Sequence, residues 1–345
     1  MDALRQDSHK VIACGPPDKY VDRLKAHCDV YIPLYSLNAK GKNPLWDLKL
    51  TREFRRVIKA NSIDLAFTFT AKPNIFFAIA AKATKVRVIP TVNGLGNVFI
   101  TPSCLSRLML KLYRVAFKNC ERVIFQNPDD LAFFLQLGII NQEQGAQTAG
   151  SGVDLVKFPH SPLKINAGSR RFLFSARLVR EKGIYEFLEA AKIILSERDD
   201  VSFKVIGMVA KNPSSLNEEE IKGYADNGLI TYTGHTDRME EEIRGADVLV
   251  LPSYYREGVP RVLLEGLATG RPIITTDSIG CRETVEDGKN GILVSPKNGK
   301  ELTEAIVCLA DMSDEELVGM SIESRLLAER KFDEADVVRL YRESV

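Results

Sequence analysis

The sequence predicts an α/β protein made of two consecutive doubly wound domains, and three observations support this prediction. Short apolar segments alternate with helical patterns along the chain, which is typical of parallel sheets covered by helices on both faces. The alternation starts again near residue 170, after a segment (159–169) that combines two prolines, a glycine and polar residues. The length of 345 residues fits two domains of ordinary size.

The first half of the chain contains six expected strands and three longer expected helices. The strands are the apolar segments His9–Cys14, Asp29–Ile32, Asp64–Thr68, Arg87–Val92, Arg122–Gln126 and Gln147–Ala149. Helical patterns lie between them at Leu48–Asn61, Ile75–Lys85 and Leu105–Cys120.

The second half repeats the same alternation. Its expected strands are Arg171–Ser175, Ser202–Ile206, Leu229–Thr233, Val248–Leu251, Pro272–Thr276 and Gly291–Val294. Its expected helices include Ile184–Ser196, Arg238–Gly245, Arg261–Thr269 and Lys300–Leu309. We therefore expect domains at 1–157 and 170–330, joined by a linker at 158–169 and facing a cleft that ligands would use. A C-terminal helix at 331–345 is expected to pack back on the first domain.

Composition excludes several classes of protein. The chain is 45% apolar and 27% charged, as expected for a folded globular protein, and no stretch approaches the 18 apolar residues of a membrane-spanning helix. The N-terminus lacks the apolar run of a secretory signal. The six cysteines form no C-x-x-C pair and the four histidines stand far apart, so we expect no metal centre, no disulfide framework and a cytoplasmic location.

The net charge of +1 conceals an asymmetry between the two halves. Residues 1–157 hold 22 Lys and Arg against 13 Asp and Glu, whereas the remainder holds 25 against 33. Halves of opposite sign suggest that different surfaces face different partners.

A first candidate site segment is FLFSARLVREKG (172–183). A buried strand is expected to end at Ser175 and a helix to begin after Gly183, which places Arg177 and Lys182 on a strand-to-helix loop. Such a loop, beside a helix N-terminus, favours anions, and two cations there suit a diphosphate. Two solvated surface cations would give the same pattern.

A second segment, VLVLPSYYREGVPRVLLEGLATG (248–270), holds two carboxylates on either side of a strand–loop–helix turn. Glu257 lies in the loop and Glu265 in the helix, and carboxylates suit sugar and ribose hydroxyls because each accepts two or more hydrogen bonds. The amides of Gly258 and Val259, at the start of the helix, would face phosphate oxygens.

A third segment, TTDSIGCRETVEDGKN (275–290), is again a strand leading into a loop. Gly280 would let the backbone approach a ligand closely. Cys281 is expected to be a small packed residue rather than a nucleophile, because no histidine is near it in the sequence.

These residues resemble the retaining family 4 glycosyltransferases of the GT-B fold, in which two Rossmann-like domains face a cleft. The resemblance rests on ARLVREKG, GADVLVLPSYYREGVPRVLLEGLATGRPIITTD and GCRETVEDGKNGILV, which span most of 171–296. It implies that Arg177 and Lys182 bind the nucleotide diphosphate of a donor. It also implies that Glu257 contacts the transferred sugar as the catalytic carboxylate and that Glu265 binds the nucleotide ribose. Arg261 would assist beside the phosphate-facing turn.

The first half narrows the resemblance. FTFTAKPNIFFAIAAK, VIPTVNGLGNVF, FQNPDD and GSGVD look like segments of bacterial enzymes that extend lipid-linked sugars for O-antigen, capsule or exopolysaccharide. The loop Asn93-Gly94-Leu95-Gly96 follows a strand and would form an amide-rich acceptor-side segment at the cleft. Lys72 follows the strand Asp64–Thr68 and is expected at the cleft rim, although an ordinary surface lysine would fit the same position.

The resemblance implies a UDP-sugar as substrate, a polyprenyl-diphosphate-linked saccharide as acceptor, and no cofactor. No D-x-D triplet occurs, so the usual carboxylate clamp for a divalent cation is missing and no metal is expected. Cationic side chains and helix termini would then neutralise the leaving diphosphate. In this family the departing phosphate is described as the base for same-face attack, so no enzyme nucleophile is nominated. The sequence leaves the donor sugar, the acceptor hydroxyl and the oligomeric state open.

Three other functions fit part of the pattern. A dehydrogenase needs G-x-G-x-x-G, which neither G-x-G string of the chain completes. A nucleotide-sugar 2-epimerase would place carboxylate and histidine groups in the cleft, and the four histidines fit no such set. A catalytically impaired sugar-nucleotide binding protein is the remaining alternative. No feature indicates a nucleic-acid partner.

A basic pattern in LSRLMLKLYRVAFKNCER (105–122) predicts contact with a membrane. Five cations recur at steps of 4, 3, 4 and 4 along one helical stripe: Arg107, Lys111, Arg114, Lys118 and Arg122. A basic amphipathic helix is typical of a membrane-surface element, although many sheet-covering helices also have a basic edge. We therefore expect peripheral binding to the cytoplasmic face of the inner membrane.

The N-terminus differs from the family pattern. Domains of this family open with a strand, a loop and a helix, but only MDALRQDS precedes the strand His9–Cys14. We therefore expect the first domain to lack its initial β–loop–α unit, of about twenty residues, and to be less stable and less active than a form that contains it.

Overall fold

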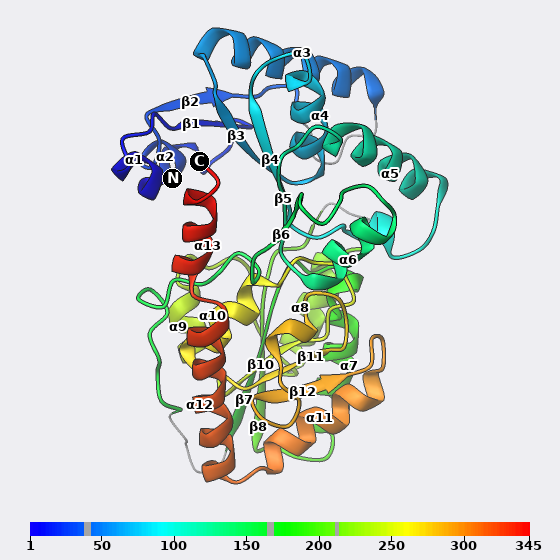
Figure 1. Cartoon of the computed structure of the whole chain (residues 1–345). Coiled ribbons are helices and arrows are strands. Elements are labelled where there is room, and N and C mark those ends of the chain that lie inside the picture. The colour runs from blue at the N-terminus through cyan, green and yellow to red at the C-terminus, as the bar shows by residue number, and fades with distance from the viewer. Residues whose placement is uncertain (38–42, 164–168, 211–213) are drawn as a thin grey trace. The chain divides into compact units, whose positions relative to one another are not determined.

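The computed structural model describes residues 1–37, 43–163, 169–210 and 214–345 and consists of two compact units (Figure 1). The first comprises Met1–Thr148 together with Val337–Val345, and the second comprises Ala149–Asp336. Of the expected linker at 158–169, residues 164–168 lie outside the described residues. Each unit has parallel strands and covering helices, so the predicted α/β class is confirmed. No helix in the described part of the chain is long and apolar enough to cross a lipid bilayer.

The first unit contains a four-stranded and a two-stranded parallel sheet. The larger has the order β3 (Leu65–Phe69), β4 (Arg87–Val92), β5 (Val123–Phe125), β6 (Gly145–Gln147). The smaller pairs β1 (Ile12–Gly15) with β2 (Val30–Pro33). Among the described residues no ladder joins the two sheets, so β1 and β3 are both edge strands.

Helices α3 (Pro44–Asn61), α4 (Ala71–Ala81) and α5 (Cys104–Phe117) form one layer of the first unit, in which α4 contacts both of its neighbours. This central position explains why α4 is apolar around most of its surface. Helices α3 and α5 both begin with a side-chain cap. The Asn43 side chain accepts from the N–H of Leu45, and Ser103 forms a capping box with Ser106. Below it, the rings of Phe117, Phe125 and Phe134 pack together in the core.

The expected basic helix is shorter than predicted. It ends at Phe117, where a turn closes with the N–H of Cys120 donating to the carbonyl of Phe117. Arg122 therefore lies beyond the helix, and its guanidinium donates to Ser344 Oγ at 2.9 Å. The prediction that five cations share one helical stripe is therefore wrong for Arg122.

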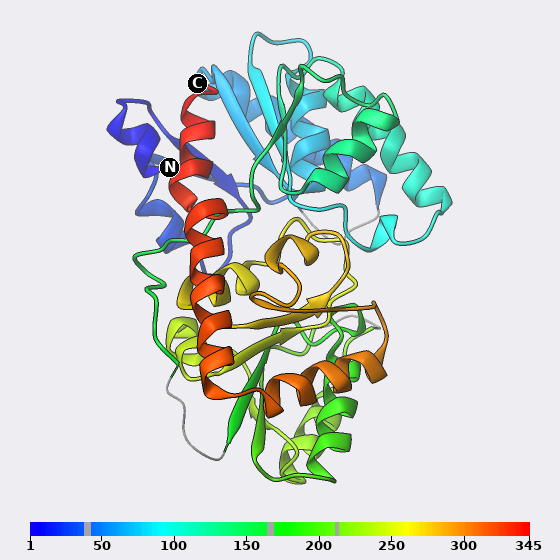
Figure 2. The same cartoon turned by 60° about the horizontal axis from the view of Figure 1, so that its bottom comes forward.

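The C-terminal helix α13 (Glu334–Arg342) contributes its last residues to the first unit (Figure 2, red helix beside the strands). Tyr341 lies edge-on to Phe67 of β3, and its hydroxyl is 2.7 Å from that of the buried Thr91 on β4. Arg87 donates to the carbonyls of Ser344 and Val345 at 3.0 and 2.8 Å. The end of the chain is therefore an integral part of this unit.

The second unit is built on one six-stranded parallel sheet. Its order is β12 (Gly291–Val294), β11 (Ile273–Thr276), β10 (Val248–Leu251), β7 (Arg170–Ser175), β8 (Val201–Ile206), β9 (Thr231–Thr233). Its helices are α7 (Ile184–Leu195), α8 (Glu218–Asp226), α9 (Met239–Arg244), α10 (Arg261–Thr269), α11 (Gly299–Asp311) and α12 (Asp314–Lys331). The inner strands β10 and β11 are buried along their whole length, as apolar parallel strands require.

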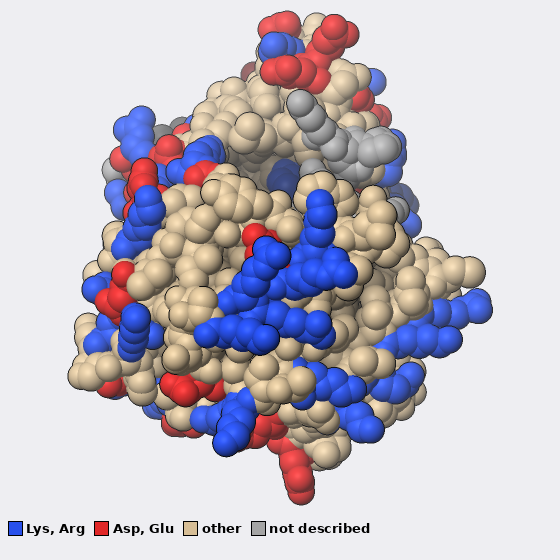
Figure 3. Space-filling model, turned by 90° about the horizontal axis from the view of Figure 1, so that it is seen from above, with Lys and Arg blue, Asp and Glu red and all other residues tan. Residues whose placement is uncertain are grey.

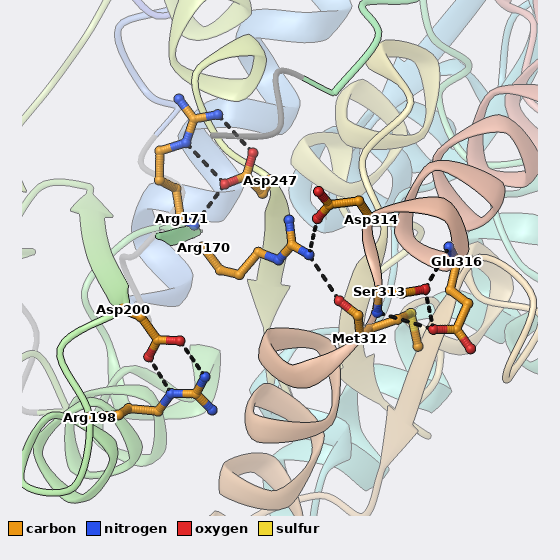
Figure 4. A network of polar contacts seen from close by, with 9 residues as sticks. All are labelled: Arg170, Arg171, Arg198, Asp200, Asp247, Met312, Ser313, Asp314 and Glu316. Carbon is orange, nitrogen blue, oxygen red and sulfur yellow. Dashed lines mark hydrogen bonds and ion pairs between the residues drawn. The ribbon is translucent and has the colours of Figure 1, made fainter. Parts of the chain in front are cut away.

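The amino ends of these strands are tied together by arginine–carboxylate pairs (Figure 4). The Arg171 guanidinium binds both oxygens of the buried Asp247 at 2.7 and 3.0 Å, which joins the start of β7 to the start of β10. Its neighbour Arg170 binds the carbonyl of Met312 and the carboxylate of Asp314 at 2.9 and 2.6 Å. Side chains thus tie neighbouring strands together at the amino end of the sheet.

Several elements differ from the sequence-based expectation. Strand β6 lies two residues earlier than the expected Gln147–Ala149, and the structure adds α6 (Pro128–Gln136), α8 and α12, as well as the short α1 (Asp2–Gln6) and α2 (Val21–Lys25). The N-caps Asn127, Asn217 and Ser313 start the three longer additions.

Candidate functional site

Three loops of the second unit begin at the carboxyl ends of adjacent parallel strands. Strand β7 ends at Ser175, β10 at Leu251 and β11 at Thr276, and the three strands are neighbours in the sheet. Because the carboxyl ends of parallel strands share one edge, the loops that follow them meet there. All three candidate segments of the second half are therefore brought together.

An ion pair between Lys182 and Glu257 joins the first two loops. The Lys182 ammonium donates to Glu257 Oε1, and the two side chains are only 10% and 15% exposed. The hydroxyl of the fully buried Ser253 donates to the same oxygen at 2.9 Å. One oxygen of Glu257 is therefore held by a cation and a hydroxyl, which fixes the direction of its carboxylate.

The third loop is attached to the same point. The hydroxyls of Thr276 and Ser278 both donate to the main-chain carbonyl of Ser253, the latter at 2.8 Å. The amides of Tyr254 and Tyr255 donate to the carbonyl of Glu181 at 2.9 and 3.0 Å. Ser253 is thus the residue through which all three loops are connected.

Arg177 lies beside this cluster and is exposed. Its guanidinium is 5.9 Å from the centre of the Tyr255 ring, and the Lys182 ammonium is 5.4 Å from the same ring. Within the described part of the chain, the Arg177 side chain forms no hydrogen bond or ion pair. Two cations gathered around one aromatic ring, one of them exposed and unpaired, can bind a ligand with two anionic groups.

Gly280 adopts a positive φ of +82°. A Cβ at this position would lie 2.1 Å from the carbonyl oxygen of Gly258 and 2.8 Å from that of Glu257. The close approach of the third loop to the protein's own second loop therefore requires glycine at this position. Gly280 thus lets the third loop pack directly against the second.

The start of α10 carries the remaining predicted residues. Pro260 precedes the helix, directly after Gly258 and Val259, and provides no side-chain cap. The first N–H groups of the helix therefore have no capping side chain. Glu265 is largely buried, and Arg261, which is 67% exposed, donates to it at 3.0 Å. Burial raises the pKa of the Glu265 carboxyl, and the Arg261 cation opposes this effect.

The predicted residues of the first unit lie at the carboxyl ends of β3 and β4. Lys72 is in the first turn of α4 and forms an ion pair of 2.6 Å with Asp47 of α3, with both side chains largely buried. Asn93 follows β4 and accepts from the N–H of Thr70 at 3.3 Å. Gly94 and Gly96 have φ values of +93° and +70°, so this loop needs glycine at both positions.

Two further groups bear on the chemistry. Cys281 is fully buried and burial raises the pKa of its thiol to about 11, so it is a packed residue and not a nucleophile. Among the described residues, no group of three or more His, Cys, Asp or Glu is placed to hold a metal ion.

Sequence reasoning missed the residues that organise the site: Ser253, Tyr255, Thr276 and Ser278. Ser253 follows a buried strand by two positions and precedes Glu257 by four, which is a local signal that could have identified it. The contributions of Thr276 and Ser278 depend on the pairing of β10 with β11, which local spacing does not reveal.

Two family models match separate parts of the chain. A model described as "Glycosyl transferases group 1" matches residues 169–312, and one described as "Glycosyl transferase 4-like" matches residues 2–127. The first match contains the whole cluster around Ser253, and the second covers most of the first unit.

Two of the relatives that the chain resembles are bacterial glycosyltransferases. The chain is 28% identical over 333 residues to the N,N'-diacetylbacillosaminyl-diphospho-undecaprenol alpha-1,3-N-acetylgalactosaminyltransferase of Campylobacter jejuni, covering 91% of this chain and 85% of that protein. It is 28% identical over 192 residues to the capsular polysaccharide biosynthesis glycosyltransferase CapM of Staphylococcus aureus, covering 53% and 50%.

Solved structures are similar over nearly the whole chain. A sucrose-phosphate synthase from Thermosynechococcus elongatus superposes with a TM-score of 0.81 at 21% identity, covering 99% of this chain and 90% of that one. Anabaena Alr3699/HepE in complex with UDP and glucose gives 0.79 at 19% identity, covering 96% and 90%. A glycosyltransferase from Rickettsia africae gives 0.78 at 18% identity, covering 99% and 92%. At these identities the likeness establishes the fold.

Proposed function

Since the chain belongs to the family 4 glycosyltransferases of the GT-B fold, we propose that it transfers a hexose or N-acetylhexosamine from a UDP-sugar to a polyprenyl-diphosphate-linked saccharide. The observation that carries the proposal is the cluster of Arg177, Lys182 and Glu257 at one edge of the second sheet. It offers two cations for a diphosphate and one oriented carboxylate for a sugar hydroxyl.

In the proposed reaction the donor diphosphate binds between Arg177 and Lys182, beside the uncapped start of α10. The glycosidic bond to the donor phosphate breaks, and the two cations neutralise the charge that develops on the leaving diphosphate. The acceptor hydroxyl attacks the anomeric carbon from the same face and passes its proton to the departing phosphate oxygen, so the configuration is retained. Glu257 orients the sugar ring and Glu265 binds the ribose, and no metal or cofactor takes part.

The acceptor assignment is supported by the similarity to the Campylobacter jejuni enzyme, whose name specifies a diphospho-undecaprenol-linked acceptor. The acceptor would contact the first unit at Lys72 and at the loop of Asn93, Gly94 and Gly96. A role of this kind places the protein in surface polysaccharide synthesis, at the cytoplasmic face of the inner membrane.

Helix α5 is the proposed contact with that membrane. Leu108 and Val115 are 53% and 52% exposed, and the side chains of Arg107 and Lys111 have no hydrogen bond or ion pair among the described residues. Arg114 is different, since it donates to the carbonyl of Leu137 at 2.8 Å while remaining near the surface. Exposed apolar and cationic side chains on one helix suit the headgroup region of an anionic bilayer.

The deciding experiment is a donor screen. The purified protein is incubated with UDP-glucose, UDP-galactose, UDP-N-acetylglucosamine or UDP-N-acetylgalactosamine, with and without a polyprenyl-diphosphate saccharide, and the release of UDP and the lipid product are measured. We expect one donor to give release that depends on the acceptor and a product with retained anomeric configuration. Interconversion of UDP-sugars without acceptor would identify an epimerase, and binding without any turnover would identify a binding protein.

A further inference from the structure

Helix α3 carries an unusual surface stripe. Leu45, Leu48, Arg52, Arg55 and Lys59 follow one another at steps of 3, 4, 3 and 4, so they share one face of the helix, and all five are exposed. The opposite face is buried through Leu50, Phe54, Val57 and Ile58. Two large apolar residues and three cations are therefore presented outward on the same line.

The acidic residues of α3 do not neutralise these cations. The Asp47 carboxylate is engaged by Lys72, and the Glu53 carboxylate accepts from the main-chain N–H groups of Tyr35 and Ser36 at 3.1 and 3.0 Å. Across the described ranges, Arg52, Arg55, Arg56 and Lys59 form no ion pair or hydrogen bond through their side chains. The charge of the stripe is thus available to an external partner.

The first turn of α3 adds an apolar cluster at one end of the stripe. Leu45, Trp46 and Leu48 are 69%, 45% and 47% exposed, and the ammonium of Lys49 lies 4.9 Å from the centre of the Trp46 ring. Neighbouring exposed apolar residues of this size usually mark a contact surface. Tryptophan beside lysine is a combination that favours the boundary between lipid and water.

The stripe belongs to a larger basic face of the first unit. Helix α4 packs against both α3 and α5, so the two basic helices are held in one layer. Figure 3, which views this side of the molecule, shows Lys and Arg side chains gathered over it with few acidic ones between them. A face that combines many unpaired cations with apolar side chains on two helices is complementary to an anionic surface that also accepts apolar groups.

We propose that α3 is a second bilayer-binding element, in which Leu45, Trp46 and Leu48 insert among lipid headgroups while Arg52, Arg55 and Lys59 bind anionic phosphates. The inference rests on the proposed membrane-bound acceptor and extends it to a helix outside the predicted 105–122 segment. The occupant is an anionic bilayer, because its surface offers phosphates to the cations and its acyl region accepts the apolar cluster at the end of the same stripe. Two elements on one rigid layer would also fix the orientation of the first unit on the membrane.

The chain offers a built-in probe, because Trp46 is its single tryptophan. The full-length protein is titrated with vesicles of phosphatidylglycerol and phosphatidylcholine, or of phosphatidylcholine alone, and tryptophan emission is recorded. We expect a shift to shorter wavelength and quenching by brominated acyl chains with the anionic vesicles only, weakened at high salt. Unchanged Trp46 emission in vesicle-bound protein would overturn the insertion.

Charge and apolar contacts are tested separately. The triple variant R52E/R55E/K59E is expected to lower the vesicle partition coefficient by at least about tenfold, since each cation near an anionic bilayer adds to binding. The matched variant K192E/K222E/K300E, with the same charge change on exposed lysines of the second unit, should bind as the parent does. The variant L45S/L48S should bind more weakly and lose the emission shift. Equal partition of the parent and the α3 triple variant would contradict the proposal.

A soluble-substrate assay separates this inference from the proposed function. Turnover of a UDP-sugar with a short, water-soluble acceptor should be the same in the parent and in R52E/R55E/K59E. Loss of vesicle binding with intact turnover supports both ideas, whereas vesicle binding without any turnover would reject the proposed function alone. An emission shift with a nucleic acid and none with vesicles would contradict the bilayer proposal and identify a nucleic acid as the partner of α3.

Discussion

The ammonium of Lys182 and the carboxylate of Glu257 form a largely buried ion pair, although 75 positions separate them in the sequence. A donor diphosphate would compete with Glu257 for this ammonium, because one cation cannot neutralise both fully. The hydroxyl of Ser253 holds the carboxylate from a second side, so Glu257 stays oriented when the ammonium turns toward phosphate. In the proposed reaction, Ser253 would therefore keep the Glu257 carboxylate in place while Lys182 binds the diphosphate.

Lys182→Ala should lower kcat/KM for the donor by about ten- to a hundredfold, since a lost charge-assisted contact costs roughly 1.5–3 kcal/mol. Arg177→Ala should act similarly on donor KM and kcat, but without the stability cost that follows when the buried Glu257 carboxylate loses its cation. The measurement is donor kinetics of both variants alongside urea denaturation. Unchanged donor kinetics in two folded variants would exclude the diphosphate assignment.

Ser253→Ala should reduce kcat by about tenfold while changing donor KM little, because the variant removes the second hydrogen bond to Glu257 and leaves both cations in place. Ser278→Ala is the matched control, since its hydroxyl binds the carbonyl of Ser253 and not the carboxylate. If both variants lose the same activity, Ser253 acts through loop packing rather than through Glu257. Michaelis–Menten analysis with the preferred donor distinguishes the two results.

Asp247→Ala should destabilise the second unit by about 2–3 kcal/mol, because it leaves the Arg171 guanidinium, 33% exposed, without its carboxylate. Asp314→Ala, whose carboxylate is 57% exposed, should cost under about 1 kcal/mol. Urea denaturation at pH 7 measures both. Equal stability of the two variants would show that burial does not govern these pairs.

Glu265→Gln should change the pH dependence of stability. Burial raises the pKa of the Glu265 carboxyl above its ordinary 4.5, so folding favours the protonated form. Its stabilising contribution is complete below pH 4.5 and is lost as the pH rises through the raised value. The variant should therefore match the parent near pH 4 and become relatively more stable toward pH 7. A stability difference that does not vary with pH would contradict this assignment.

Turnover should persist in excess EDTA. The expectation follows from the missing D-x-D triplet, since Arg177 and Lys182 would supply the positive charge that a divalent cation provides elsewhere. The assay compares UDP release with EDTA, and with EDTA followed by excess magnesium. Complete loss that magnesium restores would show that the cations alone do not neutralise the leaving group.

Much of the fold could be predicted from local patterns. Strands such as Arg87–Val92 and Val248–Leu251 match β4 and β10 residue for residue, because continuous apolar runs bounded by polar residues specify buried parallel strands. Helix α12 lacks a clear apolar periodicity, and α8 is short and polar, so neither was predicted, although their caps at Asn217 and Ser313 were present in the sequence.

The candidate site could be predicted only in part. Arg177, Lys182 and Glu257 were identified from residue type and position after a strand, and the structure brings them together. The packing contact that requires glycine at position 280 could not be deduced, because it is made with Gly258, 22 positions away in the sequence and brought close by the pairing of β10 with β11. The same strand pairing brings the hydroxyls of Thr276 and Ser278 to Ser253, so local spacing could not predict these contacts either.

The place of Tyr341 and the last residues in the first unit has a practical consequence for dissecting the protein. A fragment that stops at Thr148 would lack the ring that covers Phe67 and Thr91 and the carbonyls that Arg87 binds. The first unit is therefore discontinuous along the chain, and no single cut yields both units whole. A separately expressed version would need residues 337–345 joined to it by a short engineered connection, as in a circular permutation.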